Sequence, residues 1–380
     1  MRVLHLIAGN LFGGVETFIH LIARRPELMT HGEHHFALCF DGRLAEGIAS
    51  AGAPLERLGS MRTSRPWTVL RGRRRLRELL RQRPFDVALT HGSWAHAMFA
   101  PELERAGVPS VFYLHGPITR VGWLDRWARQ SLPAAMIGVS RDTLRTGRLL
   151  FPTVPAEVLN YPIPASFEAG ETERAAVRAE QGVGSEEIVL LQASRADHWK
   201  GHDHLFEALG RLADVPGWTC WMAGGAQRPK ERVFLAELEA QVARLGLRER
   251  VRFLGERRDV PRLLAGADVY CQANVGGEGF SLAFMEAFAA GRPIVTTRLG
   301  GAPELIDDST GVLVTPGDTA GFAAGLRRLI AEPALRRAMG EKARERVWQL
   351  CDPAARLADL DRILGDVQER AGRAPARAVG

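Results

Sequence analysis

Two successive series of short apolar runs, each alternating with helical patterns, constrain the fold of this chain more than any other feature. In the first half, strand-like runs lie at Val3–Ile7, His35–Cys39, Asp86–Thr90, Ser110–Leu114 and Ala135–Val139, with helical patterns at Val15–Arg24, Leu44–Ala51, Pro66–Arg81, Trp94–Ala106 and Arg141–Leu150. In the second half the strand-like runs are Ile188–Gln192, Thr219–Ala223, Val251–Leu254, Val269–Gln272 and Ile294–Thr297. This alternation predicts an α/β protein with two parallel sheets, each covered by helices on both faces.

A chain of 380 residues is long for one hydrophobic core, which favours two domains. Two prolines and a glycine between Asn160 and Gly170 mark the best linker. We therefore expect an N-terminal domain over residues 1–165 and a C-terminal domain over residues 166–350. A helix over residues 351–370 should pack back toward the N-terminal domain, followed by a frayed tail over residues 371–380.

The segment from Gly276 to Gly291 joins two carboxylates to a glycine-rich turn and an otherwise apolar helix. Between Leu282 and Ala290 every residue except Glu286 is apolar, and Gly291 is a natural helix end. A helix that is apolar on all sides is normally buried, so a carboxylate on it needs a partner or an adjacent cleft. Since strand-like runs flank the segment, and ligands of such units bind at strand carboxyl ends beside a helix N-terminus, we expect the chemistry here.

Two further strand ends carry residues suited to phosphate. After the first strand, Gly13 and Gly14 precede a helix, where their backbone N–H groups suit either a phosphate or sugar or merely a tight turn. Their spacing is not that of a nicotinamide-binding fingerprint, and Glu16 stands where that fingerprint needs a small residue. After a strand of the second half, Arg195 and Lys200 could both reach one pyrophosphate, although solvated loop charges are the ordinary alternative.

Composition excludes several classes of protein. No apolar run approaches the roughly 18 residues needed to cross a bilayer, and no signal-peptide pattern appears at the N-terminus. The four cysteines lie far apart, which predicts neither a disulfide framework nor a zinc site, and the cytoplasm is the expected location. The net charge of +6 comes from 47 arginines and three lysines, a coding bias that makes basicity weak evidence for a nucleic-acid partner. We expect none.

Four segments together resemble the retaining glycosyltransferases of family 4. They are Gly13–Thr17, Ser194–Arg195 with Lys200–Gly201, Glu278–Phe280 continuing to Glu286–Ala287, and Gly300–Ile306. The resemblance runs from about residue 1 to about residue 350 and implies the GT-B fold, two Rossmann-like domains that face across a cleft. It also implies transfer of a hexose-type sugar from a nucleotide sugar, UDP- or GDP-linked, to an acceptor hydroxyl with retention at the anomeric carbon.

The resemblance implies a role for each residue of the second-domain motif. Arg195 and Lys200 would neutralise the donor diphosphate as the glycosidic bond breaks, assisted by the backbone amides of Phe280, Ser281 and Leu282. Glu286 would accept hydrogen bonds from the ribose hydroxyls, and Glu278 would orient the sugar ring. No residue is nominated as a nucleophile, and no D-x-D motif or metal-ligand cluster is present, so we expect catalysis without a metal or other cofactor.

The first domain would contribute the other wall of the donor site. Gly14 and Gly13 would approach the donor, His115 would lie near the transferred sugar, and His91 and Glu16 are candidates for the acceptor side. For either histidine, the alternative is a ring hydrogen-bonded at a strand end. The chain departs from the family at Ser281, which is expected to alter the fit around the sugar, and at Tyr161, which is expected to change only the linker.

The region from Arg62 to Arg83 contains nine arginines and one acidic residue, Glu78, around an apolar stripe. A basic amphipathic helix can rest on an anionic membrane, which would place the protein at the inner face of the membrane. The favoured alternative is a sheet-covering helix with an arginine-rich outer face. The acceptor, whether glycan, lipid-linked or small molecule, is not indicated by any motif, and a non-catalytic binding protein, a sugar-nucleotide epimerase or a phosphorylase of the same fold remain alternatives.

Overall fold

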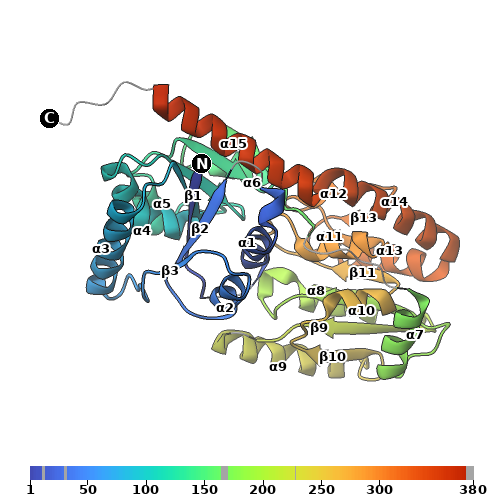
Figure 1. Ribbon diagram of the computed structural model, residues 1–380. Helices are drawn as coiled ribbons and strands as arrows, with labels where there is room; N and C mark the ends of the chain where they lie inside the picture. Colours follow the sequence, from blue (N-terminus) through green and yellow to red (C-terminus); the bar gives the residue numbers. More distant parts are fainter. Residues whose placement is uncertain (11–12, 30–31, 164–169, 227, 374–380) are drawn as a thin grey trace. The chain divides into compact units, whose positions relative to one another are not determined.

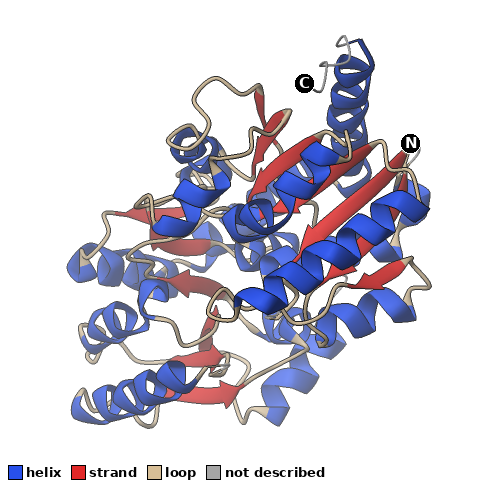
Figure 2. Ribbon diagram, turned by 90° about the vertical axis from the view of Figure 1, so that its left-hand side faces the viewer, coloured by secondary structure: helices blue, strands red, loops and turns tan. Residues whose placement is uncertain are grey.

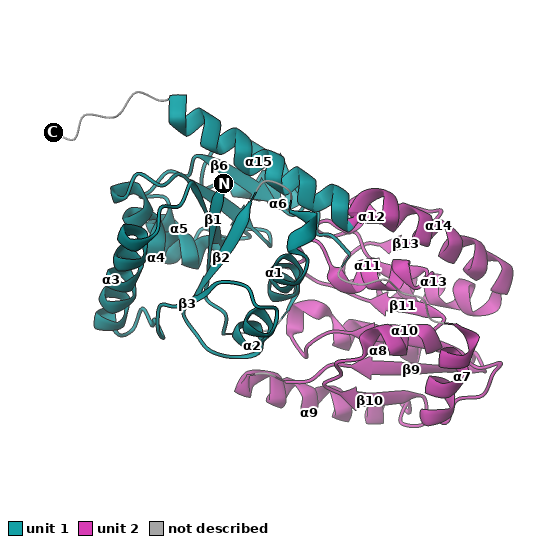
Figure 3. Ribbon diagram, in the orientation of Figure 1, with its two compact units in different colours: residues 1–164, 353–380 teal, residues 165–352 magenta. Residues whose placement is uncertain are grey.

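The computed structural model describes residues 1–10, 13–29, 32–163, 170–226 and 228–373. The chain divides into two compact units, Met1–Pro164 with Pro353–Gly380, and Ala165–Asp352 (Figure 3). Each unit has its own parallel sheet, and many of the helices and strands are labelled in Figure 1. Helices lie along the strands of each sheet (Figure 2), as the alternating sequence pattern predicted.

The first unit is built on a seven-stranded sheet. In spatial order its strands are β3 (Leu55–Arg57), β2 (Glu33–Leu38), β1 (Arg2–Ile7), β4 (Val87–His91), β5 (Ser110–Leu114), β6 (Ala135–Gly138) and β7 (Ala156–Val158). Its helices are α1 (Gly14–Arg24), η1 (Pro26–Leu28), α2 (Arg43–Ser50), α3 (Pro66–Gln82), α4 (Gly92–Arg105), α5 (Trp123–Ala128), α6 (Arg141–Gly147) and α15 (Pro353–Arg373). The chain leaves β1 for β2 and β3 on one side and β4 to β7 on the other, so the strand order reverses between β1 and β4.

The second unit has a six-stranded sheet. In spatial order its strands are β10 (Val251–Gly255), β9 (Trp218–Ala223), β8 (Ile188–Ala193), β11 (Val269–Gln272), β12 (Ile294–Thr297) and β13 (Gly311–Val314). Its helices are α7 (Glu171–Glu180), η2 (His198–Lys200), α8 (His202–Gly210), α9 (Pro229–Arg244), α10 (Val260–Gly266), α11 (Leu282–Ala289), α12 (Ala302–Leu305), α13 (Thr319–Ala331) and α14 (Pro333–Cys351). Here the order reverses between β8 and β11.

The central strands β4, β5, β11 and β12 are buried along their whole length. Strands of a parallel sheet are covered on both faces, which explains why they read as continuous apolar runs. All four cysteines are buried as well.

The predicted strands and helices are present, but short elements were missed, among them the edge strands β3, β7 and β13 and the helices α5 and α12. Each is six residues or shorter, too short for a periodic pattern to emerge. Helix α15 belongs to the first unit and continues to Arg373. The frayed tail predicted over residues 371–380 is therefore wrong for 371–373, and the remainder lies outside the described residues.

Candidate functional site

In the second unit, the predicted donor residues gather at the carboxyl ends of β8, β11 and β12. These strands are neighbours in the sheet, and the reversal of strand order lies between β8 and β11. Loops on either side of such a reversal diverge and leave room for a ligand. Lys200 follows β8, Glu278 follows β11 and Gly300 follows β12, so three loops meet at this edge.

The centre of this group is an ion pair between Lys200 and Glu278. The Lys200 Nζ lies 2.7 Å from Glu278 Oε2, and the two side chains are only 15% and 9% exposed. The same carboxylate oxygen accepts from the side-chain amides of Asn274 at 3.3 Å and Gln272 at 3.5 Å. The ammonium also lies 3.9 Å from the centroid of the Trp199 ring. A buried charge must be paired and hydrogen-bonded, and this arrangement meets both conditions.

Close backbone contacts fix the loops around this ion pair. Gly201 has φ +64°, and a Cβ there would lie 1.7 Å from the carbonyl oxygen of Ala273. Gly300 has φ +55°, and a Cβ there would lie 1.8 Å from the carbonyl oxygen of Glu278. Only glycine fits either position, because both the backbone conformation and the space exclude a side chain. The Lys200 and Glu278 loops are thus held at fixed distances from their neighbours.

Glu286 lies on α11, where its neighbours along the helix, Met285 and Ala287, are fully buried. Burial raises the pKa of the Glu286 carboxyl to about 7. Within the part of the chain that the structure describes, its carboxylate makes no hydrogen bond or ion pair. Burial, and to a smaller extent the charges of Glu278 and Glu286, raise the pKa of the Tyr270 phenol, so both carboxylates lie near that residue. Glu286 is therefore an unused acceptor beside the Lys200–Glu278 pair.

The N-terminus of α11 adds donors to the same site. The helix begins at Leu282 with Ser281 as its N-cap, and the Ser281 side chain makes no capping hydrogen bond. Phe280 and Ser281 are buried. The first backbone N–H groups of a helix lack partners within the helix and carry its positive dipole end, so this terminus suits an anion.

Arg195 is held apart from the ion pair by its own carboxylate. Its Nη1 donates to Glu231 Oε1 at 2.8 Å, and its Nη2 lies 3.9 Å from Asp197 Oδ2. Glu231 is 1% exposed and also accepts from the backbone N–H of Arg228. Each predicted phosphate cation is therefore bound to a carboxylate in this structure. Sequence analysis missed Glu231, Gln272 and Asn274. For Gln272 and Asn274 a signal was present, because polar side chains at the carboxyl end of a buried strand are candidates for a site.

In the first unit, the Gly13–Gly14 turn is closed by Glu16. The backbone N–H of Gly13 donates to Glu16 Oε2 at 2.9 Å, and Thr17 Oγ1 donates to the Gly13 carbonyl at 2.9 Å. Glu16 thus caps α1, its own helix. Leu11 and Phe12, the central residues of this loop, lie outside the described residues. The ligand roles of Gly13, Gly14 and Glu16 stay predictions.

Four histidines of the first unit form a hydrogen-bonded chain across neighbouring strands. His34 Nδ1 lies 2.7 Å from His5 Nε2, His5 Nδ1 lies 3.1 Å from His91 Nε2, and His91 Nδ1 lies 2.9 Å from His115 Nε2. His115 Nδ1 then lies 2.6 Å from the hydroxyl of Tyr161. The order β2-β1-β4-β5 brings these residues side by side, because each strand or strand end contributes one ring.

The hydrogen-bonded chain of histidines changes what the sequence led us to expect of His115 and Tyr161. Both ring nitrogens of His115 are engaged, so no nitrogen of His115 is left for a sugar hydroxyl in this arrangement. The expectation that Tyr161 alters only the linker is wrong, since its ring is buried and its hydroxyl bonds His115. Burial lowers the pKa of His5 and His91 well below the usual value and that of His115 to about 3. These rings are therefore neutral, and the site roles of His115 and His91 stay predictions.

Comparison with known proteins decides the family. The family described as Glycosyltransferase Family 4 matches residues 12–159, and that described as Glycosyl transferases group 1 matches residues 173–346. The chain belongs to glycosyltransferase family 4. The family and the GT-B fold predicted from the sequence are thereby confirmed.

The share of a relative's length that matches this glycosyltransferase differs from one relative to the next. It is 32% identical to N-acetyl-alpha-D-glucosaminyl L-malate synthase of Bacillus anthracis over 46% of this chain and 44% of that protein. It is 29% identical to a GDP-mannose-dependent phosphatidylinositol monomannoside mannosyltransferase of Mycolicibacterium smegmatis over 75% of this chain and 78% of that one. A crystal structure of HepE from Anabaena in complex with UDP-glucose has a TM-score of 0.83 at 22% identity, covering 97% of this chain and 100% of that chain. The last likeness concerns the fold alone.

Two features are absent from the residues that the structure describes. No three or more histidine, cysteine, aspartate or glutamate side chains gather there in a way that could hold a metal ion. No helix in the same part of the chain is long and apolar enough to cross a membrane.

Proposed function

We propose that the protein transfers a hexose-type sugar from a UDP- or GDP-sugar to an acceptor hydroxyl, with retention of the anomeric configuration. The observation that carries the proposal is the buried Lys200–Glu278 ion pair beside the unpartnered carboxylate of Glu286, at the strand-order reversal of the second sheet. The Lys200 cation and the N-terminus of α11 suit the diphosphate of a nucleotide sugar, while the carboxylates of Glu286 and Glu278 suit its ribose and its sugar hydroxyls.

We assign Lys200 to the leaving diphosphate. In the ligand-free site its charge is balanced by Glu278. Arrival of a diphosphate offers the ammonium a second anionic partner, and negative charge that develops on the leaving oxygen strengthens this interaction in the transition state. Arg195 would join it by exchanging part of its contact with Glu231, and the first amides of α11 would complete the set of donors.

Glu278 is assigned to sugar orientation rather than to nucleophilic attack. Three side chains donate to or pair with its Oε2, namely Lys200, Gln272 and Asn274. A carboxylate stabilised by so many donors is a weak nucleophile, because each bond must be weakened as its negative charge is lost. This supports reaction on one face of the sugar, with the leaving phosphate accepting the proton of the incoming hydroxyl.

Donor base and acceptor are proposed only as classes. The Mycolicibacterium relative is named for GDP-mannose, and the Anabaena structure contains UDP-glucose, so both bases are candidates. Among the relatives, one is named for phosphatidylinositol monomannoside, one for lipopolysaccharide core biosynthesis and one for L-malate, so lipid-linked, glycan and small-molecule acceptors all stay candidates. We propose that neither a metal nor another cofactor takes part, with Lys200 and Arg195 neutralising the diphosphate.

A nucleotide screen tests the proposal directly. UDP, GDP and ADP are compared by thermal shift, and the stabilising nucleotide is then supplied as its sugar with a range of acceptor alcohols. We expect one of the three to raise the melting temperature and its sugar to be consumed with formation of a glycoside. Nucleotide binding without any consumption would support a binding protein instead, and an altered nucleotide sugar as the product would support an epimerase.

The raised pKa of Glu286 predicts how donor affinity depends on pH. A protonated carboxyl is a poorer acceptor for two ribose hydroxyls, so affinity for the nucleotide sugar should fall as pH drops below about 7. Well below pH 7, the affinity for the nucleotide sugar should fall by about tenfold for each pH unit. Glu286→Gln should bind at least fivefold more weakly at pH 8 and show no such slope. Titration calorimetry between pH 5.5 and pH 8.5 measures both, and equal slopes in wild type and variant would remove Glu286 from the ribose site.

We place the protein in the cytoplasm, with α3 as the element that could touch a membrane surface. The packing of α3 supports the sheet-covering alternative, since Val69, Leu76 and Leu79 are buried. Its first turns nevertheless leave Trp67 61% and Leu70 64% exposed among arginines. Sedimentation with anionic vesicles, compared between wild type and Trp67→Ala, measures whether that end of the helix binds lipid.

A further inference from the structure

A cavity of about 880 Å³ opens in the second unit at the edge of the sheet opposite the Lys200–Glu278 pair. Asp268, which lines it, directly precedes β11, and Arg292 lies shortly before β12, so the cavity is at the amino ends of these strands. Five arginines line it: Arg174, Arg292, Arg336, Arg337 and Arg344. None of them belongs to the motifs that define the donor site.

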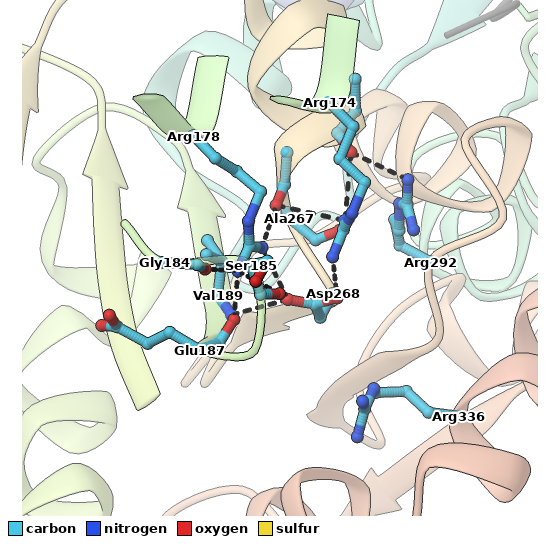
Figure 4. A network of polar contacts seen from close by, with 12 residues as sticks. Arg174, Arg178, Gly184, Ser185, Glu187, Val189, Ala267, Asp268, Arg292 and Arg336 are labelled. Carbon is cyan, nitrogen blue, oxygen red and sulfur yellow. Dashed lines mark hydrogen bonds and ion pairs between the residues drawn. The ribbon is translucent and has the colours of Figure 1, made fainter. Parts of the chain in front are cut away.

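Three of these arginines have clear structural partners. Arg174 Nη2 donates to Asp268 Oδ1 at 2.7 Å, and Arg292 donates to the carbonyls of Leu264 and Ala265 near the C-terminus of α10. Figure 4 shows Arg174 and Arg178 converging on Asp268, with Arg292 beside Arg174 and Arg336 standing apart. Arg336 Nη1 donates to the last carbonyls of α13. Helix C-termini carry partial negative charge, which explains why Arg292 and Arg336 lie at the ends of α10 and α13.

Arg337 and Arg344 are not accounted for in this way. Both lie on α14, seven residues apart and hence on one face of the helix, and both line the cavity. Neither makes an ion pair or a hydrogen bond with any residue that the structure describes. Arg344 lies close against Gly291, since a Cβ on that glycine would be 3.1 Å from Arg344 Nη2. Two arginines thus face the cavity with their guanidinium donors unused by this chain.

The carboxylates of the cavity do not balance its arginines. Five arginines face four acidic residues, of which Asp268 is shared by Arg174 and Arg178 and Glu345 pairs with Lys342 at 2.9 Å, so that Glu171 and Glu341 remain. Burial, and after it the charge of Arg174, lowers the pKa of Arg292 to about 10; Arg344 contributes in the same direction, and Asp268 and Glu171 oppose them. Positive charges therefore converge on this cavity in excess of the anions available to them.

We propose that this cavity binds a phosphate-bearing ligand with at least two negative charges, through Arg337 and Arg344 on α14 together with Arg292. A guanidinium presents a planar fork of N–H donors that matches two phosphate oxygens, and several such forks converge here. The volume is that of a small-molecule site rather than of a single ion. Trp348, 38% exposed at the cavity wall, offers an aromatic face to the uncharged part of the ligand.

Pyrophosphate titration with matched variants tests the proposal. Because the donor site should also bind pyrophosphate, calorimetry is done in a Lys200→Ala background with and without Arg337→Ala and Arg344→Ala. We expect the double cavity variant to weaken pyrophosphate binding at least tenfold. The matched control is Arg328→Ala, an exposed arginine of α13 that pairs with Glu332 outside the cavity, and it should change nothing. In otherwise wild-type protein, the cavity variant should keep its affinity for the donor nucleotide.

A second arm identifies the source of the phosphate. If phosphatidic acid vesicles bind the protein in a manner that depends on Arg337 and Arg344, while soluble pyrophosphate does not, the ligand is a lipid headgroup. If pyrophosphate binding depends on them, the ligand is soluble. If neither probe distinguishes the cavity variant from the Arg328→Ala control, the cavity is not a phosphate site and the proposal is overturned.

Discussion

Replacing Lys200 with alanine is expected to lower the turnover number by about a hundredfold or more, the usual effect of removing one preorganised charge from a developing oxyanion. The affinity for the acceptor should change little, since the lysine is assigned to the leaving diphosphate. The fold should survive, because Glu278 keeps the amide donors of Gln272 and Asn274 after its cation is lost. Initial-rate kinetics on the nucleotide sugar, with circular dichroism as a check on folding, measure the effect.

Two comparisons separate catalysis from a general loss of positive charge. Lys230→Ala removes another of the three lysines, an exposed residue of α9, and should leave the rate unchanged. Glu278→Gln removes the partner of Lys200 without removing the cation, so nucleotide affinity should hold or rise while turnover falls. If Lys200→Ala retained more than a tenth of the wild-type rate, the diphosphate assignment would be lost.

The architecture could be read from the sequence because parallel strands buried on both faces leave a continuous apolar signal. Ser110–Leu114, Val269–Gln272 and Ile294–Thr297 were predicted with the bounds they have in the structure. The strand order could not be read in the same way. It depends on which strands pair, and local periodicity carries no information about distant partners.

In the candidate site, too, the individual residues could be predicted from the sequence but their partners could not. The ion pair between Lys200 and Glu278 joins residues 78 positions apart, and although both were selected as ligand contacts, nothing in the sequence indicated that they bind each other. Glu231, which holds Arg195, lies on a helix that reads as an ordinary amphipathic surface. Charged residues at strand ends can be recognised locally, whereas the partners that balance their charge are fixed by the tertiary fold.

The histidine chain predicts an unusually steep loss of stability in mild acid. Each of its links joins Nδ1 of one ring to Nε2 of the next, so a neutral chain needs one proton per link. A second proton on His5 or His91, which have a ring nitrogen facing each of their own, places two N–H groups face to face and breaks a link. The surroundings offer little compensation. His35, itself bonded to Glu33, lies near His5, and the Tyr113 ring lies beside His91 and His115. The carboxylate of Asp361 is 3.9 Å from His34, at the far end of the chain of rings.

Stability falls with acid because the unfolded chain binds more protons than the native one. The native pKa values of His5, His91 and His115 lie below the usual 6.5, so the unfolded chain binds more protons once the pH falls below 6.5. Stability contributed by their neutral state is complete above that pH. It is lost as the pH falls toward the native values, at up to about 1.4 kcal/mol per pH unit for each ring and about 4 kcal/mol for the three. Between pH 6.5 and pH 4.5 the carboxylates with lowered pKa, such as Asp259 and Asp307, do not yet contribute. Glu286, whose pKa is raised to about 7, gains stability as it takes up its proton in this window and offsets about one ring, whereas the buried His96 and His202, with pKa values of about 4, add to the loss.

Urea unfolding between pH 8 and pH 4.5 measures this loss, and His5→Phe identifies its source. Phenylalanine fits beside Phe36, whose ring already stacks on His5 at 4.9 Å, and it removes one titrating ring from the middle of the chain. The variant should be less stable at pH 8, because His34 and His91 lose a partner, yet its stability should fall less steeply with acid. His204→Gln, in the second unit beside Asp203, should keep the wild-type slope. A wild-type free energy of unfolding that stays flat from pH 6.5 to pH 4.5, or a His5→Phe slope equal to it, would mean that these rings accept protons without unfolding.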